Sequence, residues 1–263
     1  MYPRVALVCL FASACLGSAT AGGISDPKVD GHGMRILFIG NSHTYVNDVP
    51  GILQALADSA GGETLAVETF AKADYAVIDH WYAGDASQEI AKGWAYVVLQ
   101  QGWTPAGVCR DTLRLAAKLF APGIVKAGGR PALFQTWPPE TRPAEYQGTI
   151  ESYRLAAADV DGLLFPVAEA WQALRTTAPT LQLYADGLHA NLTGSYLTAL
   201  VMYARIFQKT PVGLPRQLRL HSGTLIIVEA GTARLLQETA AKIGLAPTPA
   251  TEPTAPPIIT NRC

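Results

Sequence analysis

The sequence is poor in charged residues and carries no excess of either sign. Only 16% of its 263 residues are charged, 49% are hydrophobic, and the formal net charge at pH 7 is -1. Without a basic excess, nothing indicates a nucleic-acid partner, and the apolar content excludes global disorder. No apolar run of about 20 residues follows the N-terminal segment, so we predict no integral membrane span in the mature chain.

Cysteine is also scarce, and no cysteines and histidines are spaced as in a zinc site. The sequence therefore predicts neither a metal nor a cofactor. Of the four cysteines, Cys9 and Cys15 fall in the N-terminal segment, which leaves Cys109 and Cys263. Two cysteines in an oxidising compartment are able to pair, but the sequence leaves this pairing open.

The N-terminal segment is typical of an export signal. Arg4 precedes an apolar stretch from Val5 to Leu16, and Ala19-Thr20-Ala21 fits the small-x-small rule for cleavage. We predict a signal peptide at 1–21 and an exported protein, periplasmic or secreted. The alternative is a lipoprotein signal with Cys15 as the lipidated residue, although the leucine usual three positions before such a cysteine is absent.

Composition divides the rest of the chain into three parts. We expect a flexible leader at 22–33, one domain at 34–245, and a disordered Pro/Thr-rich tail at 246–263. Within the central part, short apolar strands alternate with amphipathic helices. This alternation predicts an α/β fold with a parallel sheet and helices on both of its faces.

Hydrophobic periodicity predicts the individual elements. Strands are expected at 35–39, 64–69, 96–102, 131–137 and 162–165, and helices at 49–60, 76–82, 111–127, 147–159, 167–176 and 192–207. Pro122-Gly123 should kink or break the third of these helices. A last amphipathic pattern covers 225–243.

The stretch around Ser42 predicts a strand, a tight turn and a helix. Ile36-Leu37-Phe38-Ile39 runs directly into Gly40-Asn41-Ser42, and apolar residues at helical spacing begin at Val49. Ligands bind at the carboxyl edge of such a sheet, where helix N-termini favour negative charge. Taken alone, Ser42 is also explained as a plain N-cap serine.

A second polar motif, Asp186-Gly187-Leu188-His189, lies in a loop before the helix at 192–207. Ester hydrolysis needs a hydroxyl nucleophile, a base, a group that orients the base, and donors for the oxyanion. A carboxylate three residues before an imidazole can accept from Nδ1 and leave Nε2 free to face Ser42. On its own, such a motif is more commonly an ordinary turn with a local hydrogen bond.

Together these motifs resemble the SGNH (GDSL-like) hydrolase superfamily, and in particular an exported bacterial branch of it. Further matching stretches occur in the same order at 39–45, 97–102, 135–138, 165–171 and 194–199. The resemblance implies a flavodoxin-like three-layer α/β/α sandwich with a parallel sheet. It also implies that Ser42 is the nucleophile, His189 the general base, and Asp186 the residue that orients it.

The oxyanion donors follow the family pattern less closely. The resemblance implies the backbone N–H of Ser42 as one donor. Where the family has a glycine in its second block, this chain has Ala73-Asp74. We therefore expect the backbone N–H of Asp74 or Ala73 to donate to the oxyanion. This requires that the Asp74 carboxylate points away from the oxyanion. Thr104 stands at the position of the family's asparagine, and the amide of Gln101 or Gln100 is the expected substitute. Losing one donor typically costs about 10²–10³ in rate, so a weakened oxyanion hole would give a slow enzyme rather than an inactive one.

The implied function is a serine esterase acting on short acyl esters, chiefly acetyl, of a small molecule or a carbohydrate. Candidates for substrate binding are Asn41, His43, Tyr45, Trp103 and Trp137, although packing explains the aromatic ones equally well. Three alternatives stay open: acyl transfer on the same residues, a lipase or lysophospholipase, and an envelope binding module without activity.

Overall fold

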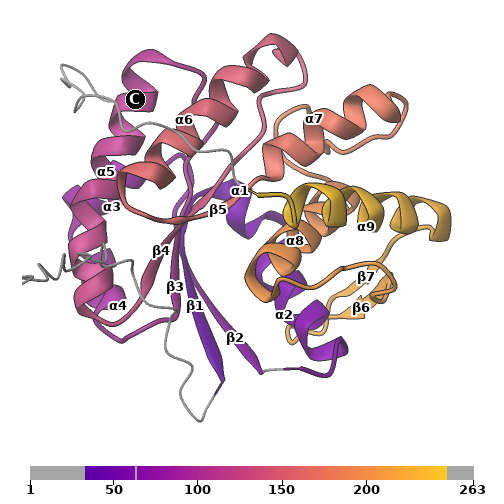
Figure 1. Ribbon diagram of the computed structural model, residues 1–263, viewed down its shortest axis with the longest axis horizontal. Coiled ribbons are helices and arrows are strands. Elements are labelled where there is room, and N and C mark those ends of the chain that lie inside the picture. Colours follow the sequence, from indigo (N-terminus) through magenta and orange to yellow (C-terminus); the bar gives the residue numbers. More distant parts are fainter. Residues whose placement is uncertain (1–32, 63, 248–263) are drawn as a thin grey trace, which may run out of the picture.

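The structure is a computed structural model that describes residues 33–62 and 64–247 (Figure 1). The predicted signal peptide, with Cys9 and Cys15, and the stretch from residue 248 to Cys263 lie outside the described residues. The domain limits and the export signal therefore stay predictions.

Five parallel strands form the central sheet, in the order β2-β1-β3-β4-β5. They are β1 (Met34–Gly40), β2 (Leu65–Ala71), β3 (Tyr96–Leu99), β4 (Arg130–Phe134) and β5 (Leu163–Phe165). In the register of the sheet, Ile36 of β1 lies between Val67 of β2 and Tyr96 of β3. The strand order reverses between β1 and β3, and such a switch point opens a crevice at the carboxyl ends of the strands.

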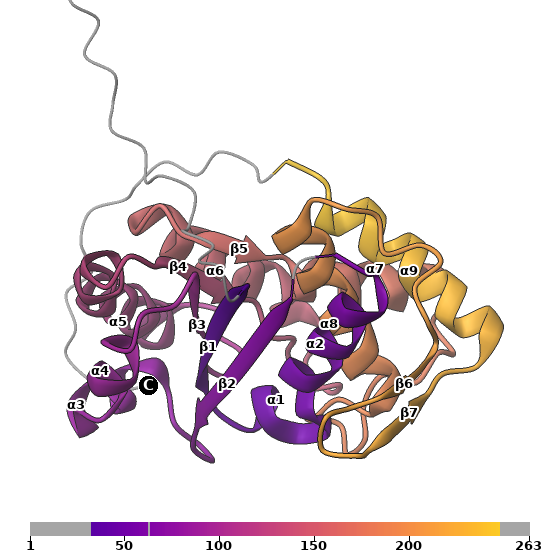
Figure 2. The same cartoon turned by 90° about the horizontal axis from the view of Figure 1, so that it is seen from below.

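Helices cover both faces of the sheet, which confirms the predicted three-layer sandwich (Figures 1 and 2). One face carries α3 (Val77–Ala83), α4 (Ala86–Ile90) and α5 (Gly107–Lys126), with α6 (Tyr146–Asp159) packed beside α5. The other carries α2 (Val49–Ser59), α7 (Val167–Thr177), α8 (Leu192–Phe207) and α9 (Ala230–Gly244). Short helical turns lie at Ser42–Tyr45 (α1), Val46–Asp48 and Pro143–Glu145.

The side chains of β1 alternate between these two layers. Ile36 and Phe38 belong to the core beneath α2 and α8, whereas Leu37 and Ile39 belong to the core beneath α3 and α5. All four are fully buried. A strand covered on both faces must be apolar at every position, which explains the continuous run that the sequence shows here.

Helix α5 continues through Pro122, so of the predicted kink or break the break does not occur. Pro122 is exposed, whereas Phe120 and Ile124 on the apolar face are buried. Packing of this face against the sheet keeps the chain helical, although proline removes one backbone donor. In addition, β4 ends at Phe134 rather than at 137.

Near the C-terminus the structure contains an antiparallel pair that periodicity does not predict. Strands β6 (Gln217–Arg219) and β7 (Leu225–Ile227) pair with each other outside the main sheet. The amphipathic pattern at 225–243 therefore divides into β7 and α9. Three residues are too few for an alternating pattern to be recognised.

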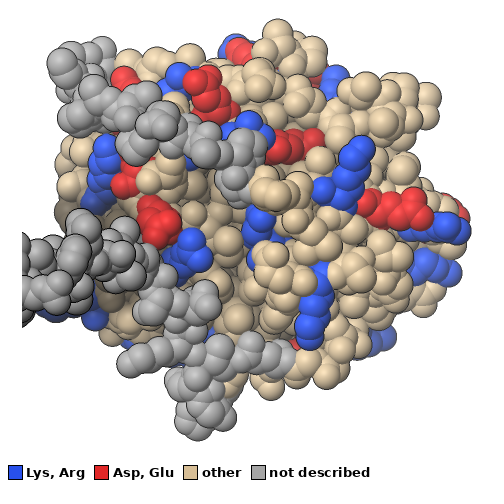
Figure 3. Space-filling view, viewed as in Figure 1, with Lys and Arg blue, Asp and Glu red and all other residues tan. Residues whose placement is uncertain are grey.

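None of the helices in the described part of the chain is long and apolar enough to cross a bilayer. On the face shown in Figure 3, the described basic and acidic side chains are interspersed among uncharged surface. A mixed surface of this kind agrees with the net charge of -1.

Candidate active site

The turn after β1 places Ser42 at the carboxyl edge of the sheet. Asn41 caps the short helix α1, because its side-chain oxygen accepts from the backbone N–H of His43 at 3.1 Å. Gly40 is needed for space at this turn: a Cβ there would lie 2.3 Å from Oε1 of the buried Gln100. Strand, turn and helix thus follow one another as predicted.

Ser42, Asp186 and His189 meet at this edge, although 147 positions separate the serine from the histidine. Ser42 Oγ lies 2.9 Å from His189 Nε2, and Asp186 Oδ2 lies 2.7 Å from His189 Nδ1. Because an ionised carboxylate only accepts, Nδ1 carries the proton and Nε2 presents its lone pair to the serine hydroxyl. This is the arrangement of a nucleophile, a base and an orienting acid.

Asp186 is held in its orientation by backbone groups of its own loop. Its Oδ1 accepts from the N–H groups of Leu188 at 2.9 Å and His189 at 2.7 Å. The hydrogen bond from the His189 ring, together with these two backbone bonds, holds the pKa of Asp186 well below its usual range. The carboxylate is therefore ionised at neutral pH and can stabilise an imidazolium on His189.

Ser42 and His189 lie in the wall of an open cavity of about 410 Å³, formed by the loops after β1, β2, β3, β4 and α7. Trp103 and Arg142 line it as well. The Trp103 indole donates to Glu145 at 2.7 Å, and the Arg142 guanidinium lies 5.8 Å from the centre of the Trp103 ring. The cavity wall therefore combines an aromatic side chain in a fixed orientation with charged groups.

Backbone N–H groups of Ser42 and Asp74 face no protein acceptor among the described residues. Asp74 lines the same cavity and has a φ of 59°, in the left-handed region that glycine favours. The position where the family has a glycine thus keeps a backbone conformation typical of glycine. Aspartate is among the residues that tolerate this conformation.

The side-chain amides of Gln100 and Gln101 are committed to other partners, which contradicts the prediction that one of them donates to the oxyanion. Gln100 Nε2 donates to Asn41 Oδ1 at 2.9 Å and to the Gln101 carbonyl. Gln101 Nε2 donates to Thr104 Oγ1 at 3.0 Å and to the Cys109 carbonyl at 3.2 Å. Gln100 instead supports the turn before the serine, since its Oε1 accepts the Asn41 backbone N–H at 2.8 Å.

Of the five predicted substrate-binding residues, the structure places three in the cavity wall: Asn41, His43 and Trp103. Tyr45 does not line it, and 41% of this residue is exposed at the end of α1. Trp137 is fully buried and does not reach the cavity either. The prediction is wrong for these last two residues, because it assumed that proximity in sequence to a motif implies exposure at the site.

His43 packs directly behind the base. Its ring centre lies 5.7 Å from that of His189, and its Nδ1 lies 3.2 Å from Asn41 Oδ1. Burial, with a smaller contribution from His189, lowers the pKa of His43 to about 4. His43 is therefore neutral at neutral pH and places no positive charge beside His189.

The sequence analysis missed His80, which fixes the backbone before the serine. His80 is fully buried, and its Nε2 donates to the Gly40 carbonyl at 2.8 Å. The same carbonyl accepts the Lys72 backbone N–H at 3.0 Å. No motif signals this role, since it depends on a contact across 40 positions of the chain.

Within residues 33–62 and 64–247, no group of three or more His, Cys, Asp or Glu side chains is arranged to hold a metal ion. Cys109 lines the cavity and is disulfide-bonded. The pairing with Cys263 that the sequence leaves open involves a residue outside the described part.

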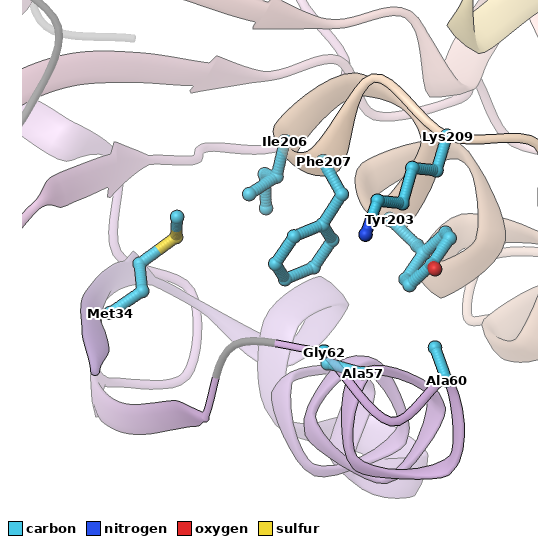
Figure 4. A pocket seen from close by; sticks show the side chains of 8 residues that line it. All are labelled: Met34, Ala57, Ala60, Gly62, Tyr203, Ile206, Phe207 and Lys209. Atoms are coloured by element: carbon cyan, nitrogen blue, oxygen red, sulfur yellow. The ribbon is translucent and has the colours of Figure 1, made fainter. Parts of the chain in front are cut away.

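A second cavity, of about 230 Å³, lies at the opposite end of β1 (Figure 4). Met34 borders it at the start of the strand, with apolar residues of α2 and α8 and with Lys209. Ser42 follows the other end of the same strand, so this cavity is separate from the site described above.

No protein-family profile matches the chain, and no curated protein matches it in sequence. Solved structures do match. A protein from Slackia heliotrinireducens assigned to the SGNH hydrolases is 26% identical with a TM-score of 0.56, over 65% of this chain and 97% of that one.

Two further solved structures share the fold at lower identity. A lipase/acylhydrolase from Enterococcus faecalis is 16% identical with a TM-score of 0.54, covering 66% of this chain and 95% of its own. An acetylxylan esterase from Geobacillus stearothermophilus is 19% identical with a TM-score of 0.52, and the match covers 69% of this chain and 97% of that one.

The comparisons confirm the resemblance to the SGNH (GDSL-like) hydrolase superfamily and its α/β/α fold. The similarity to the 26% identical structure indicates a general hydrolase role for the chain.

Proposed function

We propose that this chain is an exported serine esterase that removes short acyl groups, acetyl above all, from small-molecule or carbohydrate esters. The observation that supports it most is the hydrogen-bonded series Ser42 Oγ, His189 and Asp186 at an open cavity. A serine with only a structural role at the start of a helix would need neither the imidazole nor the cavity.

In the proposed reaction, Ser42 Oγ attacks the ester carbonyl carbon while His189 Nε2 takes the hydroxyl proton. The backbone N–H groups of Ser42 and Asp74 receive the negative charge that develops on the carbonyl oxygen. The bond to the leaving alcohol then breaks, and His189 returns the proton to that alcohol. Water, deprotonated by His189, attacks the acyl-enzyme and releases the acid, which restores the Ser42 hydroxyl.

The rim of the cavity favours a polar leaving group. Trp103, fixed by Glu145, offers an aromatic face, and Arg142 adds hydrogen-bond donors. Aromatic faces and charged donors suit a sugar ring with its hydroxyl groups. The acetylxylan esterase among the similar structures acts on an ester of this kind, which makes acetylated carbohydrate the first substrate to test.

The test is hydrolysis of p-nitrophenyl esters with acyl chains from two to twelve carbons. Wild-type chain from residue 22 is compared with Ser42→Ala and with Ser59→Ala, which changes an exposed serine of α2. We expect turnover to be highest on the acetate, to fall by about 10⁶ in Ser42→Ala, and to persist in Ser59→Ala.

Other results of this assay would favour one of the alternative functions or refute the proposal. A maximum at eight to twelve carbons favours a lipase, and activity that appears only with an added sugar acceptor favours acyl transfer. Equal inertness of the wild type and Ser42→Ala, with and without acceptor, would refute the esterase proposal.

A further inference from the structure

Trp137 lies fully buried directly behind the loop that carries Asp186 and His189. Its indole Nε1 donates to the Leu188 carbonyl at 2.9 Å. Its ring stacks on Trp171 with centres 3.8 Å apart and an interplanar angle of 3°. The donor is thus held rigidly, because the stacked and fully buried indoles cannot slide without opening the core.

The loop has hydrogen bonds within itself, but none of its side chains is anchored in the core. Residues 185–189 include no buried side chain, and 55% of the Asp186 side chain is exposed. Residues 137–140 supply the anchors instead. Besides Trp137, Tyr184 Oη at the start of the loop donates to the Pro138 carbonyl at 2.8 Å, and the Glu140 N–H donates to the Gly187 carbonyl at 2.8 Å.

We infer that Trp137 is a positioning residue for the reaction, and that its indole N–H holds the Asp186–His189 loop at hydrogen-bond distance from Ser42. This inference rests on the proposed function. Of the three anchors from this segment, the Trp137 bond is nearest in sequence to His189, since Leu188 directly precedes it. A shift of the loop by about 1 Å would break the 2.9 Å contact between Ser42 and His189, and misplacement of that size can cost about 10² in rate.

Trp171 offers a matched control for this inference. It belongs to the same stacked pair and is equally buried, but its Nε1 has no partner among the described residues. Trp137→Phe and Trp171→Phe therefore remove the same atoms from the same stack, and only the first removes a hydrogen bond to the loop. Packing losses should be similar in the two variants.

The experiment measures kcat and KM on p-nitrophenyl acetate, the rate of labelling by a fluorophosphonate probe, and the melting temperature. We expect Trp137→Phe to lower kcat and the labelling rate by about 10- to 100-fold with KM little changed. Trp171→Phe should keep both rates within about threefold, although its melting temperature falls by a similar amount.

Equal rates in the two folded variants, or a change confined to KM, would overturn the inference. If Trp137→Phe does not fold, Tyr184→Phe decides, because it removes a second hydrogen bond between the same segment and the same loop. An unchanged kcat in Tyr184→Phe would then overturn it. A wild type that neither hydrolyses esters nor reacts with the probe would instead refute the proposed function. This result concerns the wild type alone, so it is distinct from any outcome with the variants.

Discussion

Replacing Asp186 by asparagine should reverse the roles of the two nitrogens of His189. The Asp186 oxygen that accepts from Leu188 and His189 backbone N–H groups must remain an oxygen, since both partners are donors. The new NH₂ group is thereby turned toward His189 Nδ1, which now has to accept. The proton moves to Nε2, and His189 can no longer take the proton from Ser42.

The expected loss is about 10⁴ in kcat, or about 5.4 kcal/mol in the activation barrier, the size measured for this exchange in another serine hydrolase. Binding should change little, because Asp186 does not line the cavity. Stability should also change little, since both backbone bonds persist and the side chain is 55% exposed. The assay is kcat and KM on p-nitrophenyl acetate, with Ser42→Ala as the baseline and the melting temperature as the control for folding. A folded Asp186→Asn variant with kcat within tenfold of wild type would refute this assignment of the base.

Three further predictions concern the surroundings of the site. Gly40→Ala should abolish most activity and lower the melting temperature, because its Cβ would lie 2.3 Å from Gln100 Oε1 and 2.7 Å from Thr44 Oγ1; wild-type activity would contradict this steric argument. His43 has a pKa of about 4 in the folded chain, so between pH 6.5 and 4 the unfolded chain binds the extra proton and stability falls by up to about 3 kcal/mol. Urea unfolding at several pH values should show a shallower fall in His43→Phe, and equal slopes would count against a buried neutral His43. Trp103→Ala should raise KM for an acetylated xylo-oligosaccharide by about tenfold or more and leave p-nitrophenyl acetate hydrolysis nearly unchanged, whereas equal effects on both would argue against a sugar-stacking role.

Local pattern was sufficient to predict the fold class and the positions of most elements. A strand covered on both faces has to be apolar throughout, so the apolar run from Ile36 to Ile39 predicts a central parallel strand. Asp186 and His189 are three positions apart in one turn, and their hydrogen bond is local. The order of the blocks along the chain then implied that Ser42 would meet them at the sheet edge, and the structure brings them there.

Other features depended on partners far away in the sequence. Gln100 has the right chemistry for an oxyanion donor, but its amide donates to the side chain of Asn41, 59 positions away. Trp137 lies within a matching stretch and was a candidate for substrate binding, yet it is fully buried and donates to the loop of Asp186 and His189. Pro122 remains within a helix because the opposite face of that helix is packed.

The sequence by itself determined the layers of the fold, because hydrophobic periodicity acts over a few positions. It indicated the three residues of the candidate active site only through the resemblance to the SGNH superfamily. Only the tertiary structure decided which polar atoms remain free to contact a substrate. It also decided which aromatic ring, that of Trp137, contacts the loop of Asp186 and His189. Burial and hydrogen-bond competition involve groups that are distant in the sequence, such as His80 and Gly40, 40 positions apart, and Ser42 and His189, 147 positions apart. The pattern of residues along the chain does not show which groups will compete for the same hydrogen bond.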